Sequence, residues 1–531
     1  MGCHKKTGVA RNSEAARRAR RGAPIHRPGS GILDSDPLAG TLLHPLVPRP
    51  AQPPVARAPK NGSMDHSAAS ATAPHAPASP ANRTMTASPL PPHAKALLDK
   101  LEKRTATVGI VGLGYVGLPL LHAMHEGGFN TIGYDLDQKK IDMLRRGETY
   151  LHHLGTEMVT TLAKSKRFEP TADPDRLADA DVIILCVPTP LGKHHEPDMS
   201  YIEKSTEMVS KRLRPGRLIV LESTTYPGTT RGDCKPILER SGLRCGEDFF
   251  LAFSPEREDP GRTSHNTRTI PKLVGGLDDA STKLACTVYA AAVAQVVPVD
   301  SAEIAESAKL LENIYRAVNI ALVNELKPVL HAMGIDVWKV IDAAATKPFG
   351  FQAFYPGPGL GGHCIPIDPF YLTWKAKEVG LHTKFIELAG EINSAMPRYV
   401  VHRTAEGLNQ IGKPMRGSKV FVIGIAYKPD VDDIRETPAA EIITELQQLG
   451  AVVSYHDPHV PVFPRMRAYD LADLESQPLN QKTLEAADCV LIVTHHKAIQ
   501  WKTIADHARL VVDTRNMMAP YMPIRGVLVR S

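Results

Sequence analysis

Aromatic residues are scarce in this 531-residue sequence, at 5%, and none precedes Tyr115. Residues 1–98 instead hold 15 of the 44 prolines, and 13 lysines and arginines against 4 acidic residues. Such a segment cannot bury enough apolar surface to offset the entropy lost on ordering it. We therefore expect residues 1–98 to be a disordered tail, and Met85 is an alternative start of translation.

The rest of the chain lacks an excess of positive charge. The tail carries a net charge of +9 against +6 for the whole chain, so the remaining residues carry −3. This balance gives no reason to expect a nucleic-acid partner.

The sequence also lacks convincing membrane, disulfide and metal signals. Thr105–His125 has no charged side chain, but its glycines and Pro119 favour a strand and a tight turn over a membrane helix. The seven cysteines form no CxxC pair and follow no secretory signal, which predicts reduced thiols in the cytoplasm. The histidine pairs His194-His195 and His495-His496 have no HExxH spacing, and we expect no metal site.

A glycine-rich segment directly follows the first apolar run. Thr107–Gly112 reads as a buried strand, and the pattern Gly112-x-Gly114-x-x-Gly117 then leads into a helix over 118–126. In a dinucleotide-binding fold these glycines make the turn, admit a pyrophosphate and let helix and strand pack closely. A second strand ends in Asp135, where a carboxylate would bind the adenosine ribose and favour NAD over NADP.

Short apolar runs then alternate with helical segments, which predicts an α/β fold with a doubly wound sheet to about residue 300. The expected strands are 181–187, 217–223, 248–253 and 295–299. The runs 419–426, 452–457 and 487–493 loosely repeat the first domain, so we expect a second Rossmann-like domain at the C-terminus. We place the boundaries at 99–301, 302–412 and 413–531.

A long helical segment, 302–333, joins the two sheets, and Pro328 should kink or break it. One stripe is apolar, from Ile304 to Leu322. Another face carries Lys309, Asn313 and Arg316. Taken alone, this polar face is expected to be solvated.

The segment Tyr355–Asp368 combines four glycines with one cysteine and is typical of neither a helix nor an ordinary loop. Such glycines allow close approach of a ligand to the backbone. Cys364 would be a strong nucleophile as a thiolate beside a cation, although a lone cysteine is more often inert and buried.

A series of motifs in order along residues 98–531 resembles the nucleotide-sugar dehydrogenases, the family of UDP-glucose and UDP-N-acetylhexosamine 6-dehydrogenases. The motifs are GLGYVGLP, VPTP, STTYPGTT, SPERE, AESAKLLENIYRAVN, PGPGLGGHCIPIDP, AYKPDVDDIRET and DTRN. The resemblance implies an NAD-binding domain, a central helix used in dimerisation and a C-terminal domain that binds UDP. The two Rossmann-like domains would thus be joined by the long helical segment, in a homodimer or a higher homo-oligomer.

The family reaction is a four-electron oxidation of the sugar C6 alcohol to a carboxylate with two NAD+. The resemblance implies that a water held by Lys309 and Asp368 takes the hydroxyl proton. Cys364 then attacks the aldehyde to give a thiohemiacetal, which is oxidised to a thioester. Lys309 and Asn313 would stabilise the oxyanions.

The other matching residues fall into three sets. For thioester hydrolysis they are Glu256 and Thr224. For the cofactor they are Gly112, Gly114, Tyr115, Val116, Gly117, Asp135, Lys140, Thr189, Thr224 and Arg435. For the substrate they are Glu256, Arg257, Lys309, Asn313, Tyr355, Lys428 and Arg515, the last two being cations suited to UDP phosphates or uracil.

The form of the cysteine motif bears on the sugar. UDP-glucose enzymes usually read Gly-Gly-Ser-Cys, whereas this chain has Gly361-Gly-His-Cys364 followed by IPIDPFY, which resembles the UDP-GlcNAc enzymes. His363 would either contact an N-acetyl group or pack under the loop. We expect UDP-GlcNAc, with UDP-ManNAc or UDP-glucose as alternatives; a non-catalytic NAD or UDP-sugar binder is disfavoured because Cys364 and Lys309 are present.

Overall fold

The computed structural model describes residues 89–531, apart from 152–154, 193–195, 258–267, 363, 467–468 and 473. The predicted tail as far as residue 88, the His194-His195 pair and His363 lie outside the described residues. The first helix, α1 (Pro92–Glu102), begins before the predicted end of the tail at residue 98. Ala94, Leu97 and Leu101 recur there at helical spacing and are buried, so residues 92–98 belong to the folded domain.

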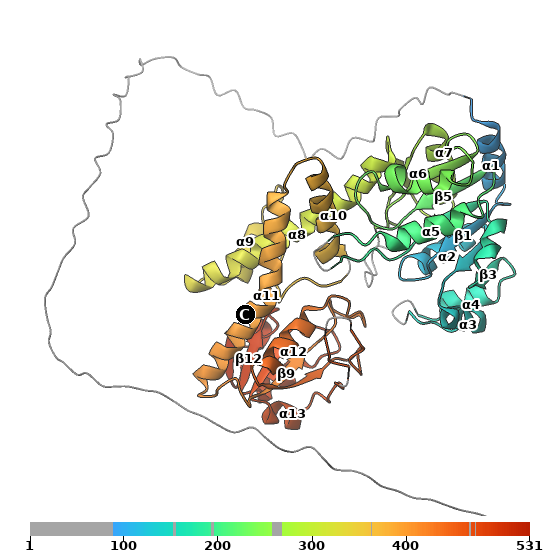
Figure 1. Ribbon diagram of the computed structural model, residues 1–531. Helices are drawn as coiled ribbons and strands as arrows, with labels where there is room; N and C mark the ends of the chain where they lie inside the picture. The colour runs from blue at the N-terminus through green and yellow to red at the C-terminus, as the bar shows by residue number, and fades with distance from the viewer. Residues whose placement is uncertain are drawn as a thin grey trace, which may run out of the picture. The chain divides into compact units, whose positions relative to one another are not determined.

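The N-terminal domain is built on an eight-stranded sheet in the order β3-β2-β1-β4-β5-β6-β7-β8 (Figure 1). The strands are β1 (Thr107–Val111), β2 (Asn130–Tyr134), β3 (Phe168–Thr171), β4 (Val182–Leu185), β5 (Arg217–Leu221), β6 (Phe249–Phe253), β7 (Lys272–Gly276) and β8 (Val296–Pro298). Paired strands are parallel except β6 and β7, which are antiparallel. Strands β1 to β6 have the 3-2-1-4-5-6 order of a dinucleotide-binding fold, which confirms the predicted doubly wound sheet.

Helices cover both faces of this sheet. Because side chains alternate along a strand, Val182 and Ile184 of β4 pack into one core and Ile183 and Leu185 into the other. The first core takes α1, α2 (Gly117–Glu126), α3 (Gln138–Arg146), α4 (Glu157–Ala163) and α7 (Asp279–Tyr289). The second takes α5 (Ser200–Ser210), α6 (Lys235–Glu239) and the start of α8 (Ala302–Ala332).

The sequence pattern does not predict β3 or β7. Strand β3 is at the edge of the sheet and contains Glu169 and Pro170, residues that single-sequence patterns exclude from central strands. Strand β7 begins with Lys272 and ends in two glycines. Both strands are therefore defined by pairing with distant segments and not by their own composition.

The C-terminal domain has a five-stranded sheet in the order β10-β9-β11-β12-β13, with every pair parallel. The strands are β9 (Lys419–Ile423), β10 (Val452–His456), β11 (Cys489–Ile492), β12 (Leu510–Asp513) and β13 (Val527–Arg530). The helices are α12 (Pro438–Gln448), α13 (Gln481–Ala486) and α14 (Trp501–His507). The order repeats that of β2-β1-β4-β5-β6 without a counterpart of β3, which confirms the predicted second Rossmann-like domain.

The repeat extends to individual hydrogen bonds. Asp181, just before β4, accepts hydrogen bonds from the backbone N–H of Thr107 and from the Nζ of Lys100. Asp488, just before β11, accepts them from the backbone N–H of Lys419 and from the Nζ of Lys413. The two domains thus fix their central strands in the same way.

Four helices join the two sheets: α8, α9 (Val337–Ala345), α10 (Cys364–Glu378) and α11 (Lys384–Gln410). Helices α10 and α11 both pack along α8. Ser301 caps the start of α8 through the N–H of Ile304. Of the two expected effects of Pro328, a break in the helix is wrong, because α8 continues to Ala332. Proline removes one backbone hydrogen bond from a helix. Packing against α11 stabilises α8, which remains helical beyond Pro328.

The apolar face of α8 is exposed and its polar face is buried, which is the reverse of what the helix pattern alone predicts. The apolar stripe is open in the single chain, where Leu311 is 66% and Leu322 52% exposed. The polar face is buried, with Lys309 and Asn313 both inside. Among the described residues, no helix is both long and apolar enough to cross a membrane.

Candidate active site

The glycine turn after β1 leaves space for a ligand at one position only. Gly112 has a φ of +92°, and a Cβ added there would lie 2.4 Å from the carbonyl oxygen of Cys186. A Cβ on Gly117 would lie 1.8 Å from the carbonyl oxygen of Gly112, whereas Gly114 has no atom within 4 Å of that position. The open side of Gly114 and the start of α2, just after Val116, therefore fit a dinucleotide pyrophosphate.

Asp135 lies at the carboxyl end of β2 and is tied to the same turn. Its Oδ2 accepts hydrogen bonds from the N–H of Leu113, at 2.9 Å, and from the Nζ of Lys140, at 3.1 Å. Its Oδ1 accepts one from the N–H of Asp137. Lys140 therefore pairs with Asp135 here, and both side chains remain at the position where a ribose would bind.

Three further predicted residues follow the carboxyl ends of neighbouring strands, where ligands bind in open α/β sheets. Thr189 follows β4 and is buried, and its carbonyl accepts a hydrogen bond from the hydroxyl of Tyr371 on α10 at 2.9 Å. Thr224 follows β5 and is half-buried. Glu256 follows β6. The Tyr371 contact attaches α10 to the N-terminal domain.

Cys364 is the first residue of α10. The preceding glycines press against Tyr427, because a Cβ on Gly361 or Gly362 would lie 2.6 or 2.8 Å from its side chain. The N–H of Gly362 also donates to the carbonyl of Arg435 at 2.9 Å. These close contacts require glycine and place the thiol at a helix N-terminus, which favours a thiolate.

The thiol is nevertheless not ionised in advance, in contrast to the simplest expectation for a cysteine near a cation. Burial raises the pKa of Cys364, and Asp368 raises it further, against the lowering effects of Lys309, Arg316 and Arg435. The thiol therefore needs a base before it can attack.

Lys309, Asn313 and Asp368 meet inside the protein. The Nδ2 of Asn313 donates to Asp368, and Arg316 donates to the Oδ1 of Asn313. Asp368 is fully buried and its Oδ1 has no hydrogen-bond partner among the described residues. Burial raises the pKa of Asp368 to about 7, with Lys309, Asn313 and Arg316 opposing the rise. A carboxyl group with such a pKa is suited to take and release protons near neutral pH.

Arg257 and Glu256 are held by neighbouring elements. Arg257 donates to Glu312 of α8 at 2.6 Å and to the carbonyl of Pro271 at 2.7 Å. Oε1 of Glu256 accepts from the N–H of Arg257, and its Oε2 lies 3.3 Å from the Nζ of Lys272. No motif in the sequence points to Lys272, and its only signal is a lysine in a strand that is otherwise apolar or glycine.

Residues of the C-terminal domain reach the same region. The guanidinium of Arg435 lies 4.4 Å above the ring of Tyr115 in the glycine turn, while Asp433 binds it at 2.6 Å. Lys428 lies 5.4 Å from the ring centre of Tyr427. Arg435 is thus placed nearer to the cofactor turn, and Lys428 nearer to the cysteine loop.

Arg515 and Tyr355 lie at the other end of the cysteine loop. A Cβ on Gly357 would lie 2.5 Å from a guanidinium nitrogen of Arg515, and burial lowers the pKa of Arg515 to about 10. Tyr355 donates to Asp342 of α9 at 2.7 Å and stacks on Trp338. No contact described here brings Tyr355 to Cys364.

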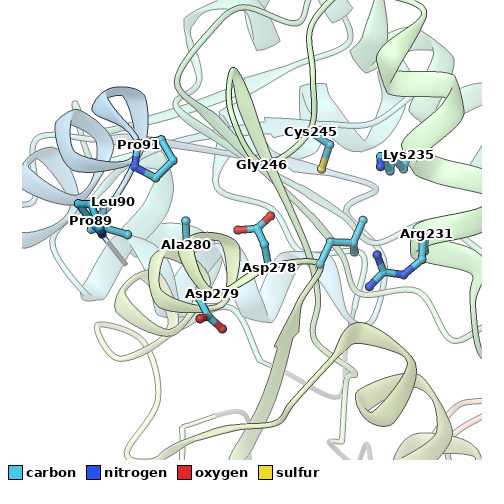
Figure 2. A pocket seen from close by; sticks show the side chains of 11 residues that line it. Pro89, Leu90, Pro91, Arg231, Lys235, Cys245, Gly246, Asp278, Asp279 and Ala280 are labelled. Atoms are coloured by element: carbon cyan, nitrogen blue, oxygen red, sulfur yellow. The ribbon is translucent and has the colours of Figure 1, made fainter. Parts of the chain in front are cut away.

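Cavities in the described part of the chain include one beside the cysteine loop and one in the N-terminal domain. One of about 420 Å³ borders α10 and is lined by residues that include Pro190, Ile365, Phe370 and Pro438. The other, of about 380 Å³, lies between the Pro89–Pro91 segment and Arg231, Lys235 and Cys245, with Asp278 facing it (Figure 2). It contains none of the predicted site residues and is not assigned to the chemistry.

His496 forms a cluster with Asp430 and His459 whose ligand atoms lie within 4.8 Å of one another. Both ring nitrogens of His496 are already engaged, because Nδ1 accepts from the N–H of Asp430 and Nε2 lies 3.1 Å from Asp457. Without a free nitrogen, His496 cannot bind a metal ion, and we assign no metal to this cluster.

Comparison with known families covers most of the described chain. The NAD binding, central and UDP binding domains of the UDP-glucose/GDP-mannose dehydrogenase family match residues 106–293, 303–395 and 421–520. The chain belongs to this family. The expected NAD-dependent nucleotide-sugar dehydrogenase and its NAD cofactor are thereby confirmed, as is the expectation of a nucleotide-sugar substrate.

Individual members of the UDP-glucose/GDP-mannose dehydrogenase family are similar over most of their length. Protein CapL of Staphylococcus aureus is 37% identical over 76% of this chain and 93% of its own. A UDP-N-acetyl-D-glucosamine 6-dehydrogenase of Pseudomonas aeruginosa is 36% identical over 73% of this chain and 90% of its own. The solved UDP-D-ManNAc dehydrogenase of Pyrococcus horikoshii has a TM-score of 0.71 at 30% identity, over 80% of this chain and 99% of its own.

Proposed function

We propose that this enzyme oxidises the C6 alcohol of UDP-N-acetylglucosamine to the carboxylate and uses two NAD+ for each sugar. The observation that carries the proposal is the meeting of Cys364 and Asp368, one helical turn apart on α10, with Lys309 and Asn313 of α8. A nucleophile, a base with a pKa near 7 and an oxyanion-binding pair are the groups that a two-step alcohol oxidation needs.

In the first oxidation, Asp368 takes the C6 hydroxyl proton through a water held between it and Lys309. Bound NAD+ supplies the acceptor for the two electrons of each oxidation step. Lys309 and the amide of Asn313 stabilise the alkoxide as the hydroxyl proton leaves. The aldehyde forms beside Cys364 and stays in the closed site.

After the first oxidation, Asp368 releases its proton to solvent through the water beside Lys309. It then takes the thiol proton of Cys364, the sulfur bonds to the aldehyde carbon, and the aldehyde oxygen takes up a proton to give a thiohemiacetal. Loss of the carbinol hydrogen with two electrons, and of the hydroxyl proton to solvent, leaves a thioester on Cys364. A water molecule positioned by Thr224 then attacks the acyl carbon, and Glu256 accepts its proton. The covalent bond explains why the aldehyde is not released.

The choice of UDP-GlcNAc rests on the form of the cysteine motif, Gly-Gly-His-Cys followed by IPIDPFY. The named relative from Pseudomonas aeruginosa acts on UDP-GlcNAc and supports this choice. The structural similarity to a UDP-D-ManNAc dehydrogenase favours UDP-ManNAc as the second candidate. Arg257, Lys428 and Arg515 supply the cations for the UDP group.

We also propose that two chains associate through α8. Its exposed apolar side chains include Ile304, Leu311, Tyr315, Leu322 and Val329, and the exposed Met333 follows its last residue. A continuous apolar stripe of this length is unfavourable in water and is typical of a protein interface. A second copy of α8 would cover it in a twofold dimer.

The test is NADH formation with a panel of UDP-GlcNAc, UDP-ManNAc, UDP-GalNAc and UDP-glucose. We expect the highest kcat/KM with UDP-GlcNAc, and two NADH formed for each sugar consumed. A higher kcat/KM with another sugar would overturn the substrate, and a ratio of one NADH for each sugar would overturn the four-electron reaction.

A further inference from the structure

Lys272 is a buried lysine that lies between two carboxylates. Its Nζ contacts Glu222, which follows β5, and lies 3.3 Å from Oε2 of Glu256, which follows β6. Lys272 and Glu222 are both buried, and the ring of Tyr289 on α7 closes the cluster at 5.4 Å from the Nζ. An ammonium group in such a place is tolerated only when negative groups compensate for its lost hydration.

Burial and charge pairing shift the pKa values of Lys272 and Glu222 in this cluster. Burial acts to lower the pKa of Lys272, but Glu222 and Glu256 outweigh it, so that the pKa lies above its usual value. Burial raises the pKa of Glu222 in spite of Lys272. Lys272 is therefore a permanent cation, and burial makes Glu222 easier to protonate than an exposed glutamate.

The cluster also connects the two halves of the site. The thiol of Cys186 lies 3.5 Å from Oε2 of Glu222, and the carbonyl of Cys186 lies directly under Gly112 of the cofactor turn. On its other side the cluster ends at Glu256, the residue that we assign to thioester hydrolysis. Lys272 is therefore not expected to contact the substrate or the cofactor itself, but it contacts Glu256, which is expected to act on the thioester.

We propose that Lys272 is a positioning residue that keeps Glu256 ionised and oriented for hydrolysis of the Cys364 thioester. The proposal rests on the function proposed above. In this step the oxygen of water bonds to the acyl carbon and the carbon–sulfur bond breaks. Glu256 takes one proton of that water, Cys364 leaves as the thiolate, and the acid product and Glu256 then each release a proton, one to the thiolate and one to solvent.

The direction of the pH effect follows from the groups that face Glu256. Among the described residues these include Lys272, Glu222, Arg257, Cys186 and Tyr289. Glu312 of α8 already pairs with Arg257. Removing the cation of Lys272 leaves Glu222 as an uncompensated neighbour of Glu256. The pKa of Glu256 then rises, and the acidic limb of the kcat profile moves to higher pH.

The experiment compares Lys272→Met and Lys272→Arg with the unchanged enzyme, with NAD+ and UDP-GlcNAc as substrates. For Lys272→Met we expect the acidic limb to move up by about one pH unit or more, so that kcat at a given pH on that limb is about tenfold lower. We also expect a burst of two NADH for each active site, and a UDP-sugar acyl adduct on Cys364 in intact-mass spectra of quenched enzyme. Lys272→Arg keeps the charge and should restore most of the profile.

Two further variants guard against a purely structural effect. If Lys272→Met does not fold, the double variant Lys272→Met/Glu222→Gln removes the buried pair together and still takes the Lys272 cation from Glu256, so a smaller shift in the same direction is expected. Asp488→Asn breaks a partly exposed lysine–carboxylate pair with Lys413 in the C-terminal domain and should change stability without an adduct or a shifted limb.

A folded Lys272→Met enzyme with an unshifted acidic limb and no adduct would overturn the proposal. That outcome differs from failure of the proposed function, which would appear in the unchanged enzyme as absence of NADH formation with every UDP-sugar.

Discussion

The side-chain amide of Asn313 donates a hydrogen bond to the carboxylate of Asp368, and this contact joins α8 to α10 inside the protein. Arg316 binds the other end of the same amide, so the orientation of Asn313 is set from both sides. One oxygen of Asp368 is thereby fixed, while Oδ1 has no hydrogen-bond partner among the described residues. The arrangement leaves one carboxylate oxygen available for proton transfer next to Cys364.

Replacing Cys364 by serine should stop net turnover and leave ligand binding intact. Burial already raises the pKa of the thiol, and an alcohol in the same place is far harder to ionise. We expect steady-state NADH production to fall at least about a thousandfold, with NAD+ and UDP-sugar affinities within a few-fold of the unchanged enzyme by calorimetry. Unchanged NADH production would rule out Cys364 as the nucleophile.

Replacing Asp135 by alanine should weaken NAD+ binding and reduce the preference over NADP+. The loss of a charged hydrogen-bond acceptor predicts about a tenfold or larger rise in the Kd for NAD+, and loss of the negative charge removes the repulsion of a 2′-phosphate. Asp135→Asn is the matched control, because it keeps an oxygen for the N–H of Leu113. If neither variant alters the NAD/NADP ratio, Asp135 does not bind the ribose.

Asp368 makes the stability of the ligand-free enzyme depend on pH. Its pKa is raised to about 7 in the folded protein, against about 3.9 in an unfolded chain, so the folded state binds the proton more tightly. The contribution of Asp368 to stability should be greatest below about pH 4 and fall as the pH rises to about 7, by at most about 4 kcal/mol.

Urea unfolding of the unchanged enzyme and of Asp368→Asn checks this dependence. The variant should be more stable than the unchanged enzyme at pH 8, with little difference at pH 4.5, and its turnover should be strongly reduced at both. Equal stability changes at the two pH values would contradict a buried, ionising Asp368.

Replacing Leu311 by glutamate should separate the proposed dimer. The side chain lies on the exposed stripe of α8 at 66% exposure, and a charge buried at its centre would cost several kcal/mol. Light scattering after size-exclusion chromatography should show about half the mass of the unchanged enzyme. Leu136→Glu, at an 83% exposed position of the N-terminal domain, is the control and should keep the dimer.

Removing residues 1–84 should leave the enzyme nearly unchanged. Helix α1 begins at Pro92, and the residues that match the family begin after residue 104, so a chain started at Met85 keeps every site residue named above. We expect the same kcat with UDP-GlcNAc and the same Tm at equal salt. A several-fold loss of turnover or a clear fall in Tm would show that the segment contributes to the fold.

The sequence by itself determined the local features of this protein. The glycine turn, the acid after β2 and the short apolar strands are patterns of neighbouring residues, so they could be read without knowledge of distant contacts. The same holds for the repeated Asp181 and Asp488 positions, which precede equivalent strands. The family motifs placed Cys364, Lys309 and Asp368 in one site.

Only the tertiary structure decided what depends on burial by distant segments. Whether the polar or the apolar face of α8 is covered depends on α10 and α11, which follow it in the chain. The raised pKa values of Cys364 and Asp368, and the pairing of Lys272 with Glu222 and Glu256, likewise arise from residues brought together from separate strands and helices. Desolvation and charge pairing are properties of the assembled interior, and no local pattern of residues encodes them.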